Sequence, residues 1–200
     1  MKYDVISDVL VIDGRFEALS TGVGGGRRRV KHILSIQVPH NFSHADPEGY
    51  INGVARSLHL DSDYVALLTA VAMKNVQILE QDYITIFATA GVTHPRSIGT
   101  INLIIVSSRE LSEGAMANAI ITATEAKTSA LFDLGFTFTG TTTDAVVVAF
   151  ERGSVGETVI YGGPSTEFGR KVTQMVRLGV KNGLIAQHGD NIKELAKHTC

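Results

Sequence analysis

An aspartate follows three threonines where the chain enters an apolar run. In the segment TGTTTDAVVVAF, residues 139–150, Asp144 directly precedes six residues that are typical of a buried strand, Ala145 to Phe150. In one interpretation Asp144 accepts backbone N–H bonds of the turn, as Asp and Thr side chains commonly do. In the other it opens onto a cleft, where its carboxylate can carry protons and the neighbouring hydroxyl of Thr143 can take part in acyl transfer.

A second carboxylate lies in a long helical pattern with few charges. Its polar residues have i, i+4, i+7 and i+11 spacing, which places them within ~60° of one another on a helix: Asn118, Thr122, Glu125 and Ser129. Lys127 lies roughly opposite, among apolar residues. An unpaired buried charge is costly, so Glu125 and Lys127 each need a partner or a function. The alternatives are structural hydrogen bonding for Glu125 and a Lys127 stem that reaches out to water.

The two carboxylates together predict acid–base chemistry. If Glu125 and Asp144 face one cleft, burial and like charge keep one protonated while the other stays ionised. One such pair suffices to activate water against an acyl carbon, with backbone N–H groups near Gly25 and Gly26 or of the Thr141 to Thr143 turn stabilising the oxyanion. We therefore predict that Glu125, Asp144 and Thr143 are catalytic. Attack by a threonine hydroxyl is the alternative to attack by water.

A glycine run beside a basic cluster is the next candidate. The segment STGVGGGRRRVKH, residues 20–32, lets the backbone approach a ligand closely at Gly25 and Gly26, whose N–H groups can bind an anion or an amide oxygen. The segment lacks the spacing and the Lys-Ser/Thr ending of a nucleotide-binding P-loop. The alternative interpretation is a mobile loop with solvated arginines.

Histidines are scattered, and two positions are of interest. His94 follows a predicted strand in TAGVTHPRSIGT and is a candidate proton carrier in an exposed loop. His40 and His44 have a spacing that suits a metal ion on a helix, yet Pro39 and Pro47 favour a loop. We therefore predict no metal site.

Turn signals and periodicity indicate the elements that must position these residues. Asp13–Gly14 predicts a tight turn between two antiparallel strands at the start of the chain. Helices are expected from the cap Asp46 to Leu58, from the cap Ser112 to a stop at Gly135, and from Ser165 or Thr166 to a stop at Gly183. The other expected strands are Ile33 to Val38, Tyr64 to Ala70, Asn75 to Leu79, Tyr83 to Ala90, Ile101 to Val106 and Ala145 to Phe150.

These elements predict an α+β fold with a mixed, largely antiparallel sheet, since the strands follow one another too closely for a helix between each pair. The helix that begins after Ser112 is apolar on every side, which predicts a central, buried helix. The helix that begins near Thr166 is amphipathic and should pack from outside. A layered α/β/β/α arrangement satisfies both, in one domain spanning residues 1–200.

Composition excludes several classes of function. The chain has 200 residues, 44% of them hydrophobic, and a net charge of −2, so no strong field recruits nucleic acid or an anionic membrane surface. No apolar run approaches a membrane span, and the amino terminus lacks the pattern of a signal peptide. The single cysteine, Cys200, forms no disulfide framework and suits a reducing cytoplasm. A cytoplasmic protein with a small-molecule partner is expected.

Several motifs resemble those of the adenosylcobinamide amidohydrolase family, the archaeal and bacterial corrinoid-salvage enzymes. In chain order they are STGVGGGRRR, TAGVTHP, GTINLIIV, LSEGAMANAIITATEAKTSAL, TGTTTDAVVVA and YGGPSTEFG, and together they span nearly the whole chain. The sequence departs from the family pattern at Thr142, where glycine is usual, and at Gly24, where asparagine is common.

The resemblance implies hydrolysis of the amide that links the aminopropanol arm to the corrin ring of adenosylcobinamide, giving adenosylcobyric acid for cobamide synthesis. No cofactor is then expected, because the corrinoid is the substrate. With the carboxylates as catalytic groups, we predict that Gly25, Gly26, Asn118, Thr122, Thr141 and His94 bind the substrate. A corrinoid carrier without activity, or an amidohydrolase for another amide, are the alternatives. A homodimer is compatible with the apolar face of the last helix or an exposed strand edge.

Overall fold

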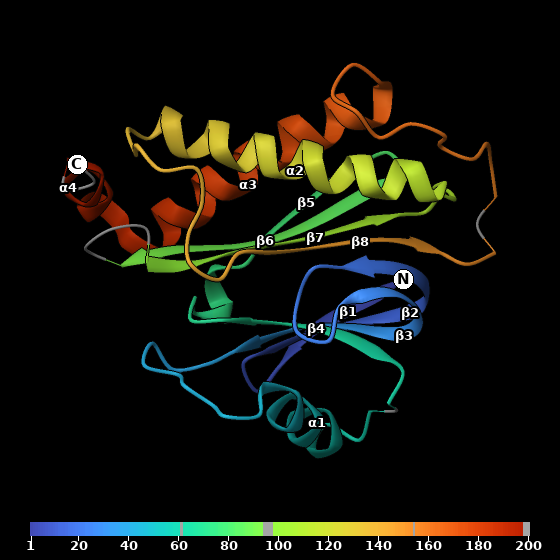
Figure 1. Ribbon diagram of the computed structural model, residues 1–200, viewed down its shortest axis with the longest axis horizontal. Helices are drawn as coiled ribbons and strands as arrows, with labels where there is room; N and C mark the ends of the chain where they lie inside the picture. The colour runs from blue at the N-terminus through green and yellow to red at the C-terminus, as the bar shows by residue number, and fades with distance from the viewer. Residues whose placement is uncertain (61, 94–97, 154, 198–200) are drawn as a thin grey trace.

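One eight-stranded sheet runs through the molecule (Figure 1). The computed structural model describes residues 1–60, 62–93, 98–153 and 155–197. The strands are β1 (Lys2–Ile6), β2 (Val9–Ser20), β3 (Gly26–Gln37), β4 (Tyr64–Thr69), β5 (Gln77–Gln81), β6 (Ile84–Thr93), β7 (Ile98–Ser107) and β8 (Ala145–Glu151). Their order is β4-β3-β2-β8-β7-β6-β5, with β1 on β2. The β3–β4 and β7–β8 pairs are parallel and the others antiparallel, which confirms a mixed, largely antiparallel sheet.

Strand β2 joins the two halves of this sheet. Its first part, residues 9–13, pairs with β1, and its second part, residues 16–20, pairs with β8, while β3 occupies the opposite edge along both parts. The register shifts between Asp13 and Phe16, so a bulge separates the two pairings. The sheet can therefore bend at β2, and its two halves come to lie face to face.

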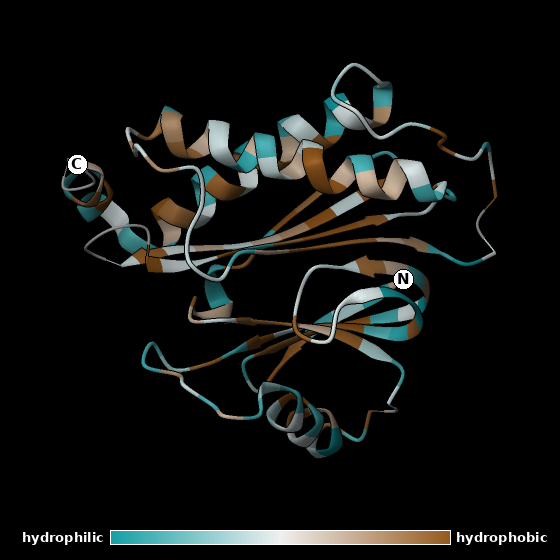
Figure 2. Ribbon diagram, viewed as in Figure 1, coloured by the Kyte–Doolittle hydropathy of each residue, from teal (hydrophilic) through white to brown (hydrophobic). Residues whose placement is uncertain are grey.

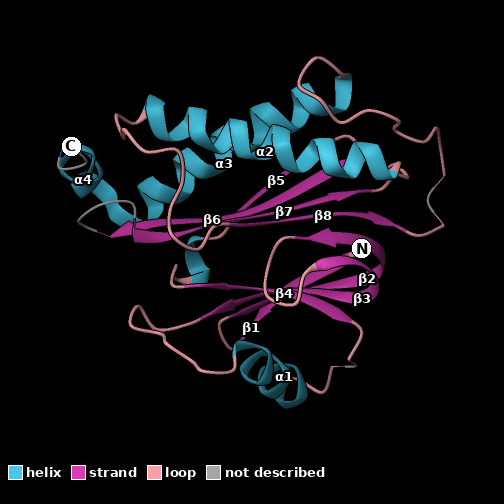
Figure 3. Cartoon of the chain, viewed as in Figure 1, coloured by secondary structure: helices cyan, strands magenta, loops and turns pink. Residues whose placement is uncertain are grey.

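Helices cover both outer faces of the bent sheet (Figure 3). The helices are α1 (Pro47–Ser57), α2 (Glu113–Asp133), α3 (Glu167–His188) and α4 (Ile192–Lys197), with short 3₁₀ turns at Met73–Asn75 and Gly189–Asn191. Asp46, Ser112 and Thr166 each cap a helix by accepting a hydrogen bond from the backbone N–H three residues on. The expected helix starts are thereby confirmed.

Three apolar clusters hold the layers together. One lies between α2, α3 and the outer face of β6, β7 and β8, a second between the two halves of the sheet, and a third between α1 and the outer face of β2, β3 and β4. Strand β8 serves two of them, because Val146 and Val148 face the helices while Val147 and Ala149 face the other half of the sheet. The predicted α/β/β/α layering is confirmed, and the strands beneath α2 and α3 are correspondingly mostly hydrophobic (Figure 2).

Three local expectations were wrong. The first tight turn is formed by Ser7 and Asp8, both with positive φ, whereas Gly14 lies at the bulge inside β2. Helix α2 is not buried on all sides, since Ile121 and Phe132 are exposed on its outer face. Helix α3 does not stop at Gly183 but continues to His188.

The glycines of α3 serve packing rather than termination. A Cβ atom on Gly183 would lie 3.2 Å from the Cβ of Ala90, and one on Gly179 would lie 3.2 Å from the Cβ of Ala88. The absence of these atoms lets the helix lie close against β6, as the positions of α3 and β6 in Figure 1 also indicate. The additional turn after Gly183 brings the end of the helix to the edge of the sheet.

No helix among the described residues is both long enough and apolar enough to span a membrane.

Candidate active site

A cavity of about 600 Å³ opens where the two halves of the sheet meet at one end. One side of its wall comes from the turn after β2, the loop that leads from β3 to α1, and the end of β4 with the residues that follow it. The other side comes from the open end of the β6–β7 pair, the residues around the start of β8 and the last turn of α3. No Lys, Arg or Glu is among the described residues that line it. The titratable residues of this described lining are His40, His44, Asp144 and His188.

Asp144 lies in the wall with both carboxylate oxygens occupied. Oδ1 accepts hydrogen bonds from the backbone N–H of Ile101 at 2.8 Å and from the Thr141 hydroxyl. Oδ2 accepts from the backbone N–H of Thr141 at 2.9 Å and from Nζ of Lys127 at 2.5 Å. The carboxylate thus ties the threonine turn to β7 and to α2. This matches the first interpretation of Asp144, an acceptor of backbone N–H groups, with a buried cation added.

The cation is Lys127, whose side chain is only 8% exposed. The structure therefore supplies the partner that a buried ammonium requires, and the stem does not reach out to water. Gly140 makes room for the pair, because a Cβ atom there would lie 2.6 Å from Nζ of Lys127 and 2.8 Å from Oδ2 of Asp144. A glycine in this position is thus a packing requirement of the ion pair.

The threonines of the same turn are also tied to β7. Thr143 Oγ1 lies 2.6 Å from Oγ1 of Thr100 and donates to the carbonyl oxygen of Gly99 at 2.9 Å. Thr142 and Thr143 line the cavity, whereas Thr141 lies behind them against Asp144. The Thr143 hydroxyl has no carboxylate or imidazole partner among the described residues, so no base activates it in this state.

Three imidazoles line the cavity among the residues that the structure describes, two of them from the loop after β3. Nδ1 of His44 accepts the backbone N–H of Asp46 at 3.1 Å, and its ring packs against Phe42 and Tyr50. His40 precedes it on the same loop, is exposed, and makes no hydrogen bond with any described residue. The spacing that suggested a metal pair on a helix therefore belongs to a loop, as the prolines predicted.

The third imidazole, His188, comes from the last turn of α3. Its Nε2 accepts the backbone N–H of Val92 at 3.1 Å, so the neutral ring carries its proton on Nδ1. Burial lowers the pKa of His188, and the charge of His40 lowers it further. His188 is therefore neutral at neutral pH. Beside it, Oε1 of Gln187 accepts hydrogen bonds from the backbone N–H of Ala72 and from Asn75.

Sequence reasoning missed both of these residues, because Gly183 predicts a helix end before them. Asn102 was also missed. It is 2% exposed in β7, where its side chain donates to the carbonyl oxygen of Leu68 at 2.8 Å and accepts the N–H of Ala145 at 3.1 Å. The available signal was a lone amide inside the apolar run GTINLIIV, since a buried amide must find partners.

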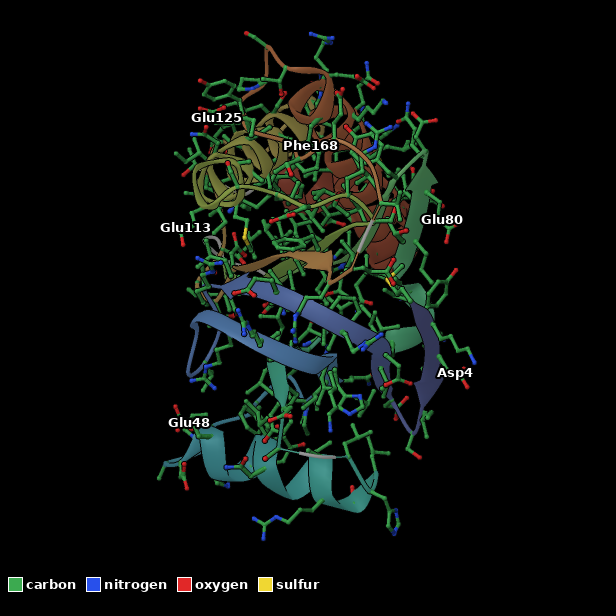
Figure 4. The ribbon with its side chains drawn as sticks, turned by 90° about the vertical axis from the view of Figure 1, so that its right-hand side faces the viewer. Asp4, Glu48, Glu80, Glu113, Glu125 and Phe168 are labelled. Carbon is green, nitrogen blue, oxygen red and sulfur yellow. The ribbon has the colours of Figure 1, made fainter. Side chains whose placement is uncertain are left out.

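The prediction that Glu125 and Asp144 converge on one cleft is wrong. Glu125 is exposed on the outer face of α2, pointing away from the sheet in Figure 4, and it does not line the cavity. Two other polar residues with the same helical spacing as Glu125 also lie outside the cavity lining. Thr122 is buried and donates to the carbonyl oxygen of Gly162, and Asn118 is half-buried away from the cavity. The physical reason is that apolar residues also lie on the outer face of α2. The hydropathy pattern of the helix therefore did not show which of its faces packs against the sheet.

The glycine run contributes its first part to the cavity. Thr21, Gly22 and Val23 line it, whereas Gly25 and Gly26 do not. The N–H of Gly25 is already donated to the carbonyl oxygen of Gly22 at 2.9 Å, which closes a tight turn between β2 and β3.

Two of the three arginines of this segment form ion pairs. Arg27 and Arg29 both bind the carboxylate of Glu17, which is 8% exposed, and Arg27 also pairs with Glu113 at the start of α2. His94, the predicted proton carrier, lies outside the described residues. Among the residues described, no group of three or more His, Cys, Asp or Glu side chains is arranged to hold a metal ion.

In chemical terms the described lining of the cavity is nearly neutral, because the one carboxylate among these residues is matched by Lys127. It offers hydroxyl groups, backbone groups and imidazoles, which suit a polar but uncharged ligand with amide groups. Among the described residues, it contains no base that is already hydrogen-bonded to a nucleophilic hydroxyl.

Comparison with known proteins gives the site its context. A family model described as adenosylcobinamide amidohydrolase matches residues 6–192. A protein of that name from Methanosarcina mazei is 46% identical over 195 residues, covering 92% of this chain and 98% of the relative. A protein of the same name from Halobacterium salinarum is 32% identical, covering 83% of this chain and 79% of its own. An uncharacterised protein from Methanocaldococcus jannaschii is 31% identical over 84% of this chain and 81% of its own.

The matched region includes every segment that lines the cavity, from the turn after β2 to the last turn of α3. The resemblance seen in the motifs is thereby confirmed over almost the full length. The chain belongs to the adenosylcobinamide amidohydrolase family.

Proposed function

We propose that this chain hydrolyses the amide between the aminopropanol arm and the corrin ring of adenosylcobinamide. Water adds to the amide carbon, the C–N bond breaks, and the products are adenosylcobyric acid and free aminopropanol. The corrinoid is the substrate, and the protein supplies the groups that bind it and move protons. Return of the acid to cobamide synthesis is the role that fits this product.

The cavity at the junction of the two sheet halves is the observation that carries this proposal. Its volume is about 600 Å³, against about 110 Å³ for a second pocket beside α1, and the segments that the sequence shares with the family build much of its wall. Corrinoids are fringed by amide side chains, which need hydrogen-bonding partners rather than counter-charges. A lining of threonines, imidazoles and backbone groups, with its single carboxylate already neutralised, suits such a ligand.

Asp144 acts in this proposal as a positioning residue. Its four hydrogen bonds hold the Thr141 to Asp144 turn against β7, so the backbone of Thr142 and Thr143 is presented to the cavity in one conformation. A preorganised turn of this kind can donate to the oxygen of the tetrahedral intermediate. Direct attack by the Thr143 hydroxyl is the less favoured route, because that hydroxyl donates to the carbonyl oxygen of Gly99.

The test is an assay of both products with the purified chain and adenosylcobinamide. We expect aminopropanol and adenosylcobyric acid to form in equal amounts. An Ala70→Trp variant should block binding and turnover, because Ala70 lines the cavity and an indole would occupy its volume. Ala117→Trp is the matched control, since Ala117 is exposed on α2 and outside the cavity lining.

The outcomes separate the alternatives. Tight corrinoid binding without release of aminopropanol at any time would make the chain a carrier and end the proposal. Hydrolysis that survives Ala70→Trp would move the active site elsewhere. Faster cleavage of a different amide in a substrate panel would keep the reaction and change the substrate. A cytoplasmic location and a homodimer stay predictions, the latter measurable by sedimentation equilibrium.

A further inference from the structure

Hydrolysis of an amide needs a group that first removes a proton from water and then delivers one to the departing nitrogen. Such a group requires a free lone pair in the resting site. Among the described residues of the cavity wall, the side chains that titrate are Asp144, His44, His188 and His40. Their hydrogen bonds decide which of them is available.

Asp144 is occupied on both oxygens. Three of its four donors are the backbone N–H of Ile101 in β7 and the backbone N–H and hydroxyl of Thr141 in its own turn. The fourth is the Lys127 ammonium. Protonating this carboxylate would break the ion pair and loosen the turn. Asp144 therefore holds the site in shape and is not free to cycle a proton.

Two imidazoles have their acceptor nitrogen blocked. The backbone N–H of Asp46 points at Nδ1 of His44, and that of Val92 points at Nε2 of His188. In each neutral ring the remaining nitrogen carries the proton. Both rings can donate a hydrogen bond to a carbonyl oxygen of the ligand, but neither can accept a proton from water without losing its backbone partner.

His40 differs from both. It lines the same cavity from the loop between β3 and α1, it is exposed, and neither of its ring nitrogens is hydrogen-bonded to a described residue. We propose that His40 is the proton carrier of the hydrolysis and a catalytic residue of this site. This inference rests on the proposed function and names the group that performs its proton transfers.

The proton balance of the step is complete. His40 takes a proton from water while the water oxygen forms a bond to the amide carbon, which leaves an oxyanion and an imidazolium. The imidazolium then protonates the nitrogen as the C–N bond breaks and the oxyanion returns to a carbonyl group. The products are a carboxylic acid and a free amine, and His40 is neutral again.

The groups around His40 favour a positive charge on only one of the neighbouring imidazole rings at a time. Among the described residues, the titratable groups that share the cavity wall with His40 are His44 on its own loop, His188 on α3, and Asp144 before β8 with Lys127 behind it. Burial lowers the pKa of His188, and so does the charge of His40. A neutral His188 therefore adds no like charge beside the imidazolium of the reaction.

The experiment compares His40→Ala and His40→Gln with the wild-type chain across pH. In the wild type, kcat/KM should rise with pH over the interval in which imidazoles titrate in general, about pH 5 to 8, because the base must be unprotonated. Both variants should lose ~100-fold or more in kcat and lose this rising limb, with little change in corrinoid affinity. Added imidazole should partly restore the rate of His40→Ala but not that of His40→Gln.

Two further variants make the comparison specific. His44→Gln should lower the rate but keep the rising limb, because His44 is a donor whose acceptor nitrogen is blocked. His59→Asn should behave as the wild type, since His59 is exposed, lies outside the cavity lining and has a positive φ that asparagine tolerates.

The inference and the proposed function fail in different ways. A wild-type chain that releases no aminopropanol refutes the function. A wild-type chain that hydrolyses the amide, together with His40 variants that keep both the rate and the rising limb, overturns the inference alone. The inference is also overturned if His40→Ala raises KM and weakens corrinoid binding while the pH limb is unchanged, because His40 would then be a ligand-binding residue.

Discussion

At the scale of single residues, the buried ion pair of Lys127 and Asp144 organises the site. The two side chains are 8% and 14% exposed, and the pair connects α2 to the turn that lines the cavity. A buried pair of this kind contributes little net stability compared with apolar residues, yet removing one partner leaves the other charge uncompensated. Its value here is that it fixes the turn before β8.

We predict that Lys127→Met destabilises the chain by about 3 kcal/mol, because Asp144 loses its cationic partner in a largely buried position. Denaturant unfolding measures the change. Glu125→Gln is the control on the same helix, and it should change stability by no more than ~0.5 kcal/mol, since Glu125 is exposed. The double variant Lys127→Met with Asp144→Asn should lose less than the sum of the single changes. Strict additivity would show that the two side chains are not coupled.

At the scale of elements, the length of α3 decides what reaches the cavity. The helix passes Gly179 and Gly183 without breaking because tight packing on β6 offsets the low helix propensity of glycine. The extra turn brings Gln187 and His188 to the cavity wall. The glycines thus influence the site from more than one helical turn away.

We expect Gly183→Leu to force α3 away from β6, where even a Cβ atom would lie 3.2 Å from that of Ala90. Overpacking of this kind costs ~1–3 kcal/mol, and the displaced helix end should lower the rate of amide hydrolysis. The matched control is Ala186→Leu, which adds the same side chain on the exposed face of the same helix. If Gly183→Leu loses stability but keeps its turnover rate, the packing of α3 on β6 does not influence the site.

At the scale of the whole molecule, the site depends on the bend of the sheet. The two halves are joined through β2 at one end, and Asn102 links them again beside the cavity by bonding β4 and β8 from β7. The cavity lies where the two halves of the sheet move apart, next to the hydrogen bonds of Asn102. Its shape therefore depends on contacts between strands that are distant in the sequence.

We predict that Asn102→Leu costs at least about 2 kcal/mol, because it leaves a buried carbonyl group and a buried N–H group without partners. Thermal or denaturant unfolding measures this loss, and the amide hydrolysis assay should show a reduced rate. Asn182→Leu, at an exposed position of α3, is the control and should be nearly neutral. An Asn102→Leu variant of normal stability would mean that water satisfies these two groups.

Much of the local structure could be predicted because short-range patterns carry it. The caps at Asp46 and Ser112, the apolar run of β8 and the amphipathic face of α3 all follow from residue types at fixed spacing. The fold class followed from the same patterns, whereas the family was indicated by the resemblance of whole motifs. The sequence also indicated Asp144, because an aspartate before a buried strand must find hydrogen-bond partners.

The partners themselves could not be predicted. Whether Glu125 or Lys127 turns toward Asp144 depends on the rotation of α2 about its axis, and the apolar residues on both of its sides left that rotation open. The presence of His188 beside His40 depends on how closely α3 packs on β6. By itself the sequence determined most elements and the layers, because local periodicity encodes burial, while its motifs indicated the family by resemblance. Only the tertiary structure decided which side chains share the cavity, because that depends on long-range packing of a bent sheet.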